Sequence, residues 1–186
     1  MQTVQDDFDR LLQNATFWME KSASLRAAAG AVWFALEPGR SESIAPTLPA
    51  EVPIDFTVGT WQVYRLLCGM SLELAYKAAL VAQGLKVPPT HDLVKLAELA
   101  GAHVTKKEHG ILELLHQCVV WEGRYPVPKH PDSLEYFVFL HYENLYRPVR
   151  TGNAVIFKPV EPHPLDWDEY NKLWEHAHAT FEWHHS

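Results

Sequence analysis

Glu73 and Lys77 are a pair whose types and spacing suggest chemistry, because they lie four residues apart in an otherwise apolar stretch. A Glu one turn before a Lys is the favourable order for an ion pair on a helix. In so apolar a segment, both side chains are expected to be partly buried. The spacing therefore predicts a structural ion pair, with a role in a ligand pocket as the alternative.

Polar residues also lie at two predicted helix ends. His91 and Asp92 follow Thr90, and an acidic residue in the first turn of a helix is favoured by the helix dipole. Arg124 follows Gly123 directly after an apolar helical pattern, where a cation interacts with the last carbonyl groups. We expect structural roles at positions 91 and 92, whereas the role expected for Arg124 is compatible with phosphate binding.

The eleven histidines raise the question of a metal site. Glu113 with His116, and Glu182 with His185, form Glu-x-x-His pairs like those of di-iron helical bundles. His109 shares a face with the first pair, but three residues of one helix make an incomplete site. We predict no metal and no cofactor, and we keep a metal-carboxylate bundle enzyme as a third hypothesis.

Apolar residues recur at helical spacing through most of the chain. The pattern predicts one long helix or two in tandem before a proline-rich loop over 37–57, and a central helix over 58–83 that is apolar nearly all round. Short connections between the inner helices favour antiparallel neighbours. The sequence therefore predicts an all-α fold, an antiparallel up-and-down bundle that forms a single domain over 1–186.

Helix-capping residues divide the later part of the chain. The predicted helix starts are Thr90, Thr105 with Glu108, Asp132 with Glu135, and Asp166 with Glu169. In the helix after Asp132, the residues expected to point inward are Leu134, Phe137, Val138 and Leu145. A Gly152-Asn153 turn predicts a small β-hairpin. The expected parts are an N-terminal helix and crossover over 1–57, a core bundle over 58–146, a loop or hairpin over 147–165 and a C-terminal helix over 166–186.

The net charge of −7 excludes a bulk positive field that would attract polyanions. Residues 58–130 alone have a positive balance, with 8 bases against 6 acids, so a nucleic-acid site must be local. Cys68 and Cys118 lie in apolar helical patterns without a Cys-x-x-Cys partner, which is typical of reduced, buried thiols. With an acidic start and no long apolar run, the sequence predicts a cytoplasmic protein without a membrane segment.

Three short motifs in order resemble those of the HEPN family, a group of small all-helical domains. They are Leu72-Glu73-Leu74-Ala75-Tyr76-Lys77-Ala78-Ala79-Leu80, His91-Asp92-Leu93-Val94-Lys95-Leu96 and Gly123-Arg124-Tyr125-Pro126. The resemblance covers the stretch from Tyr64 to Pro128, about a third of the chain. It implies a four-helix bundle that dimerises.

Many HEPN members are metal-independent endoribonucleases whose motif is an Arg followed, four to six residues on, by a His. By this resemblance the catalytic residues are Arg124 and His130, which have five residues between them. A guanidinium can neutralise a phosphate while an imidazole moves the proton of the 2′-hydroxyl. The residues expected to bind RNA or a nucleotide near this pair are Glu73, Lys77, His91, Asp92, Tyr125 and Lys129.

The Arg-Tyr-Pro pattern of residues 124–126 resembles the branch of the family that accompanies nucleotidyltransferases. This supports a second hypothesis, a non-catalytic module that binds an antitoxin or a nucleotidyltransferase. A ribonuclease requires Arg124 and His130 to face one cleft near a dimer axis. A binding module requires an exposed apolar patch elsewhere on the protein.

Overall fold

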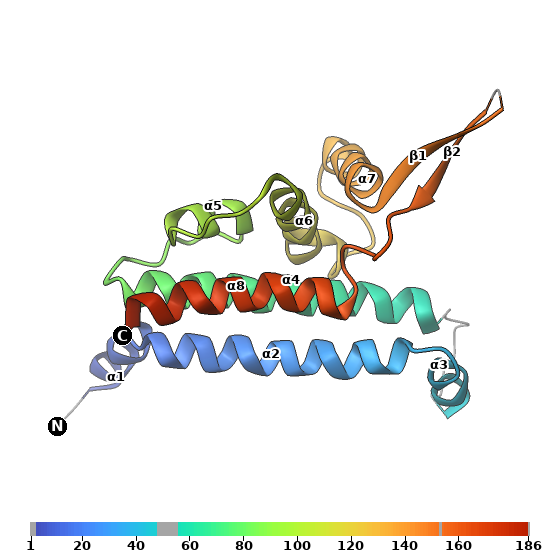
Figure 1. Ribbon diagram of the computed structural model, residues 1–186. Helices are drawn as coiled ribbons and strands as arrows, with labels where there is room; N and C mark the ends of the chain where they lie inside the picture. Colours follow the sequence, from blue (N-terminus) through green and yellow to red (C-terminus); the bar gives the residue numbers. More distant parts are fainter. Residues whose placement is uncertain (1–2, 48–55, 153, 186) are drawn as a thin grey trace.

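The computed structural model describes residues 3–47, 56–152 and 154–185, with only the backbone described at 45 and over 182–185. Three long helices lie side by side, α2 (Ala15–Leu36), α4 (Phe56–Ala82) and α8 (Trp167–His185) (Figure 1). Helices α5 (Leu93–Leu99) and α6 (Lys106–Gln117) lie on α4 and α8, and α7 (Pro131–Leu145) packs on α6. These three helices form the second layer. The fold is all-α, as the sequence predicts.

Figure 1 also shows the directions of the long helices. Helix α2 runs antiparallel to α4, whereas α8 runs in the same direction as α4. The second layer and the hairpin return the chain to the end at which α4 begins, and this return makes α4 and α8 parallel. The expected antiparallel arrangement therefore applies to α2 with its two long neighbours.

The N-terminal part forms two helices in tandem, α1 (Val4–Leu12) and α2. Thr3 caps α1 with a capping box, and the Asn14 side chain accepts from the backbone N–H of Phe17 to begin α2. Helix α2 ends before Pro38 and Gly39 as predicted, and a short helix α3 (Arg40–Ile44) and a 3₁₀ turn η1 (Ala45–Thr47) follow. Pro49 and Pro53 of the predicted loop lie outside the described residues.

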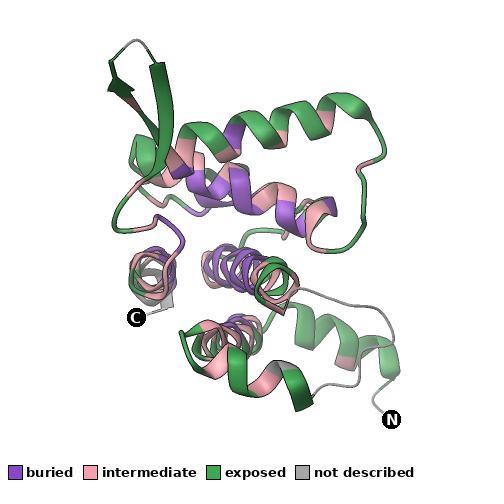
Figure 2. Ribbon diagram, turned by 90° about the vertical axis from the view of Figure 1, so that its right-hand side faces the viewer, coloured by how far each residue is buried: buried purple, intermediate pink, exposed green. Residues whose placement is uncertain are grey.

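Helix α4 forms the centre of the core. Thirteen of its residues are buried, and α2, α8 and the second layer cover it on different sides (Figure 2). Cys68 and Cys118 are buried free thiols, as predicted. No helix in the described ranges is long and apolar enough to cross a membrane.

Two predicted helix starts are confirmed and two are wrong. Thr105 and Glu108 form the capping box of α6, and Asp166 Oδ1 accepts from the N–H of Glu169 at 2.8 Å.

Helix α5 is capped by Asp92 and not by Thr90, because the Asp92 side chain accepts a hydrogen bond from the N–H of Lys95. Helix α7 begins at Pro131 with His130 at the N-cap position, so Asp132 lies inside its first turn. Proline at the first helical position needs no hydrogen-bonded N–H, which explains the earlier start.

The inward face predicted for α7 is partly wrong. Leu145 is buried and Phe137 is partly buried against the core, but Leu134 and Val138 are 46% and 44% exposed. Leu140, two residues after Val138, is buried instead. Because apolar residues occur on most sides of this helix, its sequence does not select the face that packs.

The predicted hairpin is confirmed. Strands β1 (Tyr146–Thr151) and β2 (Ala154–Pro159) pair antiparallel and extend away from the helices (Figure 1). Gly152 has φ of +61°, which favours glycine in the turn. Every residue of β2 is exposed. The hairpin is thus a projecting arm whose second strand lies on the surface.

Gly69 marks a close approach between α4 and the second layer. A Cβ atom at Gly69 would lie 2.6 Å from Cγ2 of Val119 and 3.0 Å from the carbonyl oxygen of Leu115. We expect Gly69→Ala to lower the free energy of unfolding by about 1–3 kcal/mol. Gly110→Ala is the matched control, because the added Cβ would meet the Asn144 carboxamide, which can rotate away. Urea unfolding compares the two, and equal losses in both variants would contradict this reason.

Candidate functional site

The predicted catalytic residues lie in the exposed connection before α7. Arg124 follows a π-helical turn, η2 (Cys118–Glu122), and His130 occupies the N-cap position of α7. Both side chains belong to exposed residues, as do those of Tyr125 and Lys129. The structure therefore places all four predicted residues of this connection at the surface.

Arg124 has no counter-ion in the part of the chain that the structure describes. Its guanidinium carbon lies 5.4 Å from the centre of the Tyr125 ring, and Nη2 is 3.5 Å from the Tyr125 hydroxyl. No carboxylate among the described residues lies within ion-pair distance of Arg124. An exposed guanidinium without a carboxylate partner is available to an anion from solution.

His130 lies near Arg124 in sequence, but no contact joins the two side chains within the described structure. The His130 side chain makes no hydrogen bond to the first turn of α7. Its ring is therefore not committed to capping the helix. One connection thus carries a guanidinium without a carboxylate partner and an imidazole that does not cap α7, and no hydrogen bond joins the two in the described part of the chain.

Backbone hydrogen bonds hold the start of this connection. The N–H groups of Arg124 and Tyr125 both donate to the carbonyl of Trp121, at 2.9 and 2.7 Å. Gly123, predicted as a helix cap, has φ of −79° and so does not adopt the left-handed conformation. A Cβ at Gly123 would instead meet Cβ of Leu66 at 2.7 Å. Glycine is needed here because the turn lies close against α4.

A buried ion pair that the sequence analysis missed lies directly before Arg124. Nη2 of Arg65 on α4 is 2.5 Å from Oε1 of Glu122 in η2, and both side chains are less than a tenth exposed. Arg65 Nε and Glu122 Oε2 are buried and have no hydrogen-bond partner among the described residues. The sequence contains one indication of this pair, because Arg65 interrupts the apolar pattern of the central helix. The pair fixes the turn from which the connection begins.

Burial and the nearby Arg65 shift the pKa values of two groups in this region, Cys118 and His141. Burial raises the pKa of the Cys118 thiol above its ordinary value, although the nearby Arg65 opposes the rise. Burial, and then Arg65, lower the pKa of His141 on α7. Cys118 is therefore protonated at neutral pH and is not an activated nucleophile.

The predicted pair of Glu73 and Lys77 is confirmed and has a third member. Lys77 Nζ donates to Glu73 Oε1 at 2.6 Å, and His91 Nδ1 lies 2.9 Å from Glu73 Oε2. Both residues of the pair are buried, whereas the His91 side chain is 56% exposed. His116 Nδ1 lies 2.9 Å from the His91 carbonyl oxygen. Asp92, also a predicted ligand residue, has the structural role of capping α5.

The described residues hold no group of three or more His, Cys, Asp or Glu side chains that could bind a metal ion. The Tyr136 hydroxyl donates to Glu113 at 2.9 Å, and His109 Nδ1 lies 3.7 Å from the same carboxylate. His116 of the first Glu-x-x-His pair contacts the carbonyl of His91. The side chains of the second pair, Glu182 and His185, lie outside the described residues.

Comparison of this chain with protein-family models, with curated proteins and with solved structures finds no significant match to any of them. Function is therefore inferred from the arrangement of the side chains and from the short motifs.

The Arg65 and Glu122 pair provides a test of what holds the connection. We expect Glu122→Gln to lower the free energy of unfolding by about 3–5 kcal/mol, because Arg65 stays buried without a counter-charge. The double variant Arg65→Met with Glu122→Leu is expected to recover most of this loss. Asp7→Asn, which breaks an exposed pair with Arg10, is the control and should change stability by about 0–1 kcal/mol. Denaturant unfolding decides, and a small effect of Glu122→Gln would show that the pair does not hold the turn.

Proposed function

We propose that this protein is a HEPN-like, RNA-binding protein that cleaves RNA without a metal ion at the connection between η2 and α7. One observation carries the proposal. The exposed guanidinium of Arg124 has no carboxylate partner among the described residues, and it shares the eight-residue connection over 123–130 with the His130 ring, which does not cap α7. The resemblance of the motifs to those of HEPN proteins supports the same residues.

The charge of the connection favours a phosphodiester ligand. Residues 123–131 contain Arg124, Lys129 and His130 and no acidic residue, in a protein of net charge −7. Such a local cationic segment can bind phosphate groups although the whole protein is acidic. The exposed Tyr125 ring offers a surface on which a base can stack.

Each residue then has a defined role. Arg124 binds the non-bridging oxygens of the scissile phosphate and neutralises the charge that develops on them. His130 removes the proton of the 2′-hydroxyl, the 2′-oxygen attacks phosphorus, and the bond from phosphorus to the 5′-oxygen breaks. The leaving 5′-oxygen takes a proton from water, and the His130 imidazolium then returns its proton to the solvent. The products are a 2′,3′-cyclic phosphate and a 5′-hydroxyl. Lys129 binds a neighbouring phosphate.

We further propose that the protein is a homodimer that associates through an exposed apolar face on α7 and β2. The residues of this α7–β2 face are Leu134, Val138, Tyr142, Val155 and Phe157. The first three recur every four residues on α7, and the ring of Tyr142 meets that of Phe157 at 5.6 Å. An exposed apolar face of this kind marks an interaction site.

The hairpin also favours a second copy as the partner. A two-stranded hairpin without other cover is marginally stable in water. The hairpin carries Arg147, Arg150 and Lys158 and no acid, whereas α7 carries three acids and neither Lys nor Arg. In a two-fold contact, the acidic α7 of each copy can face the basic hairpin of the other.

The proposed activity is tested with a mixed RNA pool in EDTA. We expect the wild type to cleave the pool and His130→Ala and Arg124→Ala to lose at least about 100-fold in rate, since general acid–base catalysis contributes about 10²–10⁴-fold. His103→Ala, an exposed histidine in another loop, is the matched control and should cleave like the wild type. Absence of cleavage, or equal cleavage by all four proteins, would remove the assignment.

The proposed dimer is tested by light scattering of the wild type and of Val138→Glu. A charge at this 44% exposed position is expected to give monomers, because an unpaired carboxylate would be buried in the interface. Leu99→Glu on α5, where the leucine is 47% exposed, is the control and should stay dimeric. A monomeric wild type contradicts the proposed homodimer.

The same face favours one other function, a non-catalytic module that binds a different protein such as an antitoxin or a nucleotidyltransferase. A monomeric wild type without ribonuclease activity would support this function, because the α7–β2 face would then be free for a heterologous partner. A dimer that cleaves RNA would exclude it as the principal function.

A further inference from the structure

A cleft of about 880 Å³ opens between the end of α1 and the C-terminal end of α4. Leu12, Trp18 and Lys77 contribute to its lining, together with the loop over 84–89. Clefts of this size are typical of sites for small molecules. The proposed RNA site at the connection before α7 and the α7–β2 face do not use the residues of this cleft, although Lys77 is one of the residues that the sequence predicts to bind RNA.

An apolar slot of about 310 Å³ adjoins the cleft. The two share Leu12 and Trp18, so the Trp18 side chain lies between them. The remaining residues of the slot are Phe8, Leu11, Phe17, Lys21 and Leu74. The Trp18 indole N–H donates to the carbonyl of Leu12 at 3.0 Å, which fixes the ring that both spaces share.

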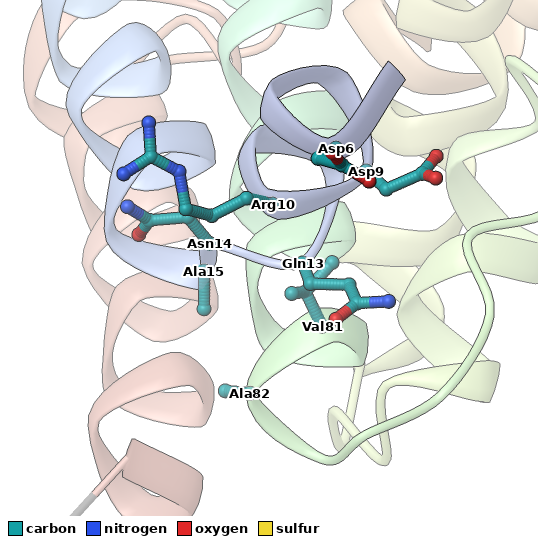
Figure 3. A pocket seen from close by; sticks show the side chains of 8 residues that line it. All are labelled: Asp6, Asp9, Arg10, Gln13, Asn14, Ala15, Val81 and Ala82. Carbon is teal, nitrogen blue, oxygen red and sulfur yellow. The ribbon is translucent and has the colours of Figure 1, made fainter. Parts of the chain in front are cut away.

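A third cavity lies at the α1–α2 junction. It has a volume of about 710 Å³ and shares Gln13 and Val81 with the cleft (Figure 3). Helix α1 therefore has open space around it, and it has no buried residue. Its Phe8, Leu11 and Leu12 are 42–54% exposed. A ligand in the slot would cover these side chains and hold α1 in place.

The charge of the two spaces indicates the class of ligand. Lys77 and Lys86 line the cleft, Lys21 lines the slot, and no Asp or Glu is among the described residues of either lining. This is unexpected in a protein of net charge −7. Lys77 is 8% exposed and gives one hydrogen bond to Glu73, and an ammonium group has two further N–H donors. The buried ammonium is thus held in position with donors to spare.

We propose that this site binds a small amphipathic monoanion, an aliphatic carboxylate whose head group lies at Lys77 and whose tail lies in the apolar slot. Glu73 neutralises one of the cations, so the cleft retains the charge of about one cation, which matches a monoanion better than a dianion. The tail contacts Phe8 and Leu11 of α1 and the Trp18 ring. Helix α1 then acts as a cover that becomes ordered when the ligand binds.

Dodecanoate is the probe, titrated into the full-length protein and followed by calorimetry. We expect saturable 1:1 binding, and Lys77→Met should weaken it about ten-fold or more, the loss typical of a hydrogen bond to a charged group. Lys106→Met, at an exposed lysine of α6, is the control and should bind like the wild type. Dodecanol and dodecyl phosphate should each bind at least about ten-fold more weakly than dodecanoate.

A second variant covers the case in which Lys77→Met does not fold. Leu11→Gln changes an exposed residue of α1 that lines the slot, and it should weaken dodecanoate about five-fold or more by loss of apolar contact. Hydrogen exchange of residues 4–12 should slow when the wild type binds dodecanoate. Equal binding of dodecanol, tighter binding of dodecyl phosphate, or unchanged exchange in α1 would overturn the proposal. These outcomes do not depend on whether the protein cleaves RNA.

Discussion

The burial of α4 is the constraint on which the rest of the structure depends. This helix is covered by α2, α8 and the second layer, so a polar side chain on it has little access to water. Such a side chain must find its partner inside the protein. Arg65 pairs with Glu122 in η2, and Glu73 pairs with Lys77 on α4 and with His91 in the loop before α5. The polar groups of one buried helix therefore determine where two outer segments attach.

These buried ion pairs fix the positions of the outer segments more than they stabilise the fold. Apolar contacts of α4 supply most of the favourable free energy of folding, whereas the desolvation of two charges offsets much of what a buried ion pair gains. The pair of Arg65 and Glu122 nevertheless ties the π-helical turn that precedes Arg124 to α4. The candidate RNA site is thus exposed and lies directly after a turn fixed in the core.

The features predicted from sequence are those set by nearby residues. The ion pair of Glu73 and Lys77, the capping box of α6 and the hairpin each depend on positions within a few residues of one another. Contacts over longer separations could not be predicted, as between Arg65 and Glu122, which are 57 residues apart. The packing face of α7 was mispredicted because apolar residues occur on most sides of this helix and only Leu140 and Leu145 are buried. The site residues could be named from motifs, but their exposure follows from the packing.

The surface around α7 divides between two kinds of partner on electrostatic grounds. The connection before α7 and the hairpin after it are cationic, and α7 between them carries Asp132, Glu135 and Glu143. The carboxylates of α7 would repel the phosphates of an RNA strand that lay along this helix. RNA bound at the connection must therefore leave α7 aside, and the apolar α7–β2 face stays available for protein. The proposed dimerisation and the proposed RNA binding would therefore use adjoining parts of one surface without competing for the same residues.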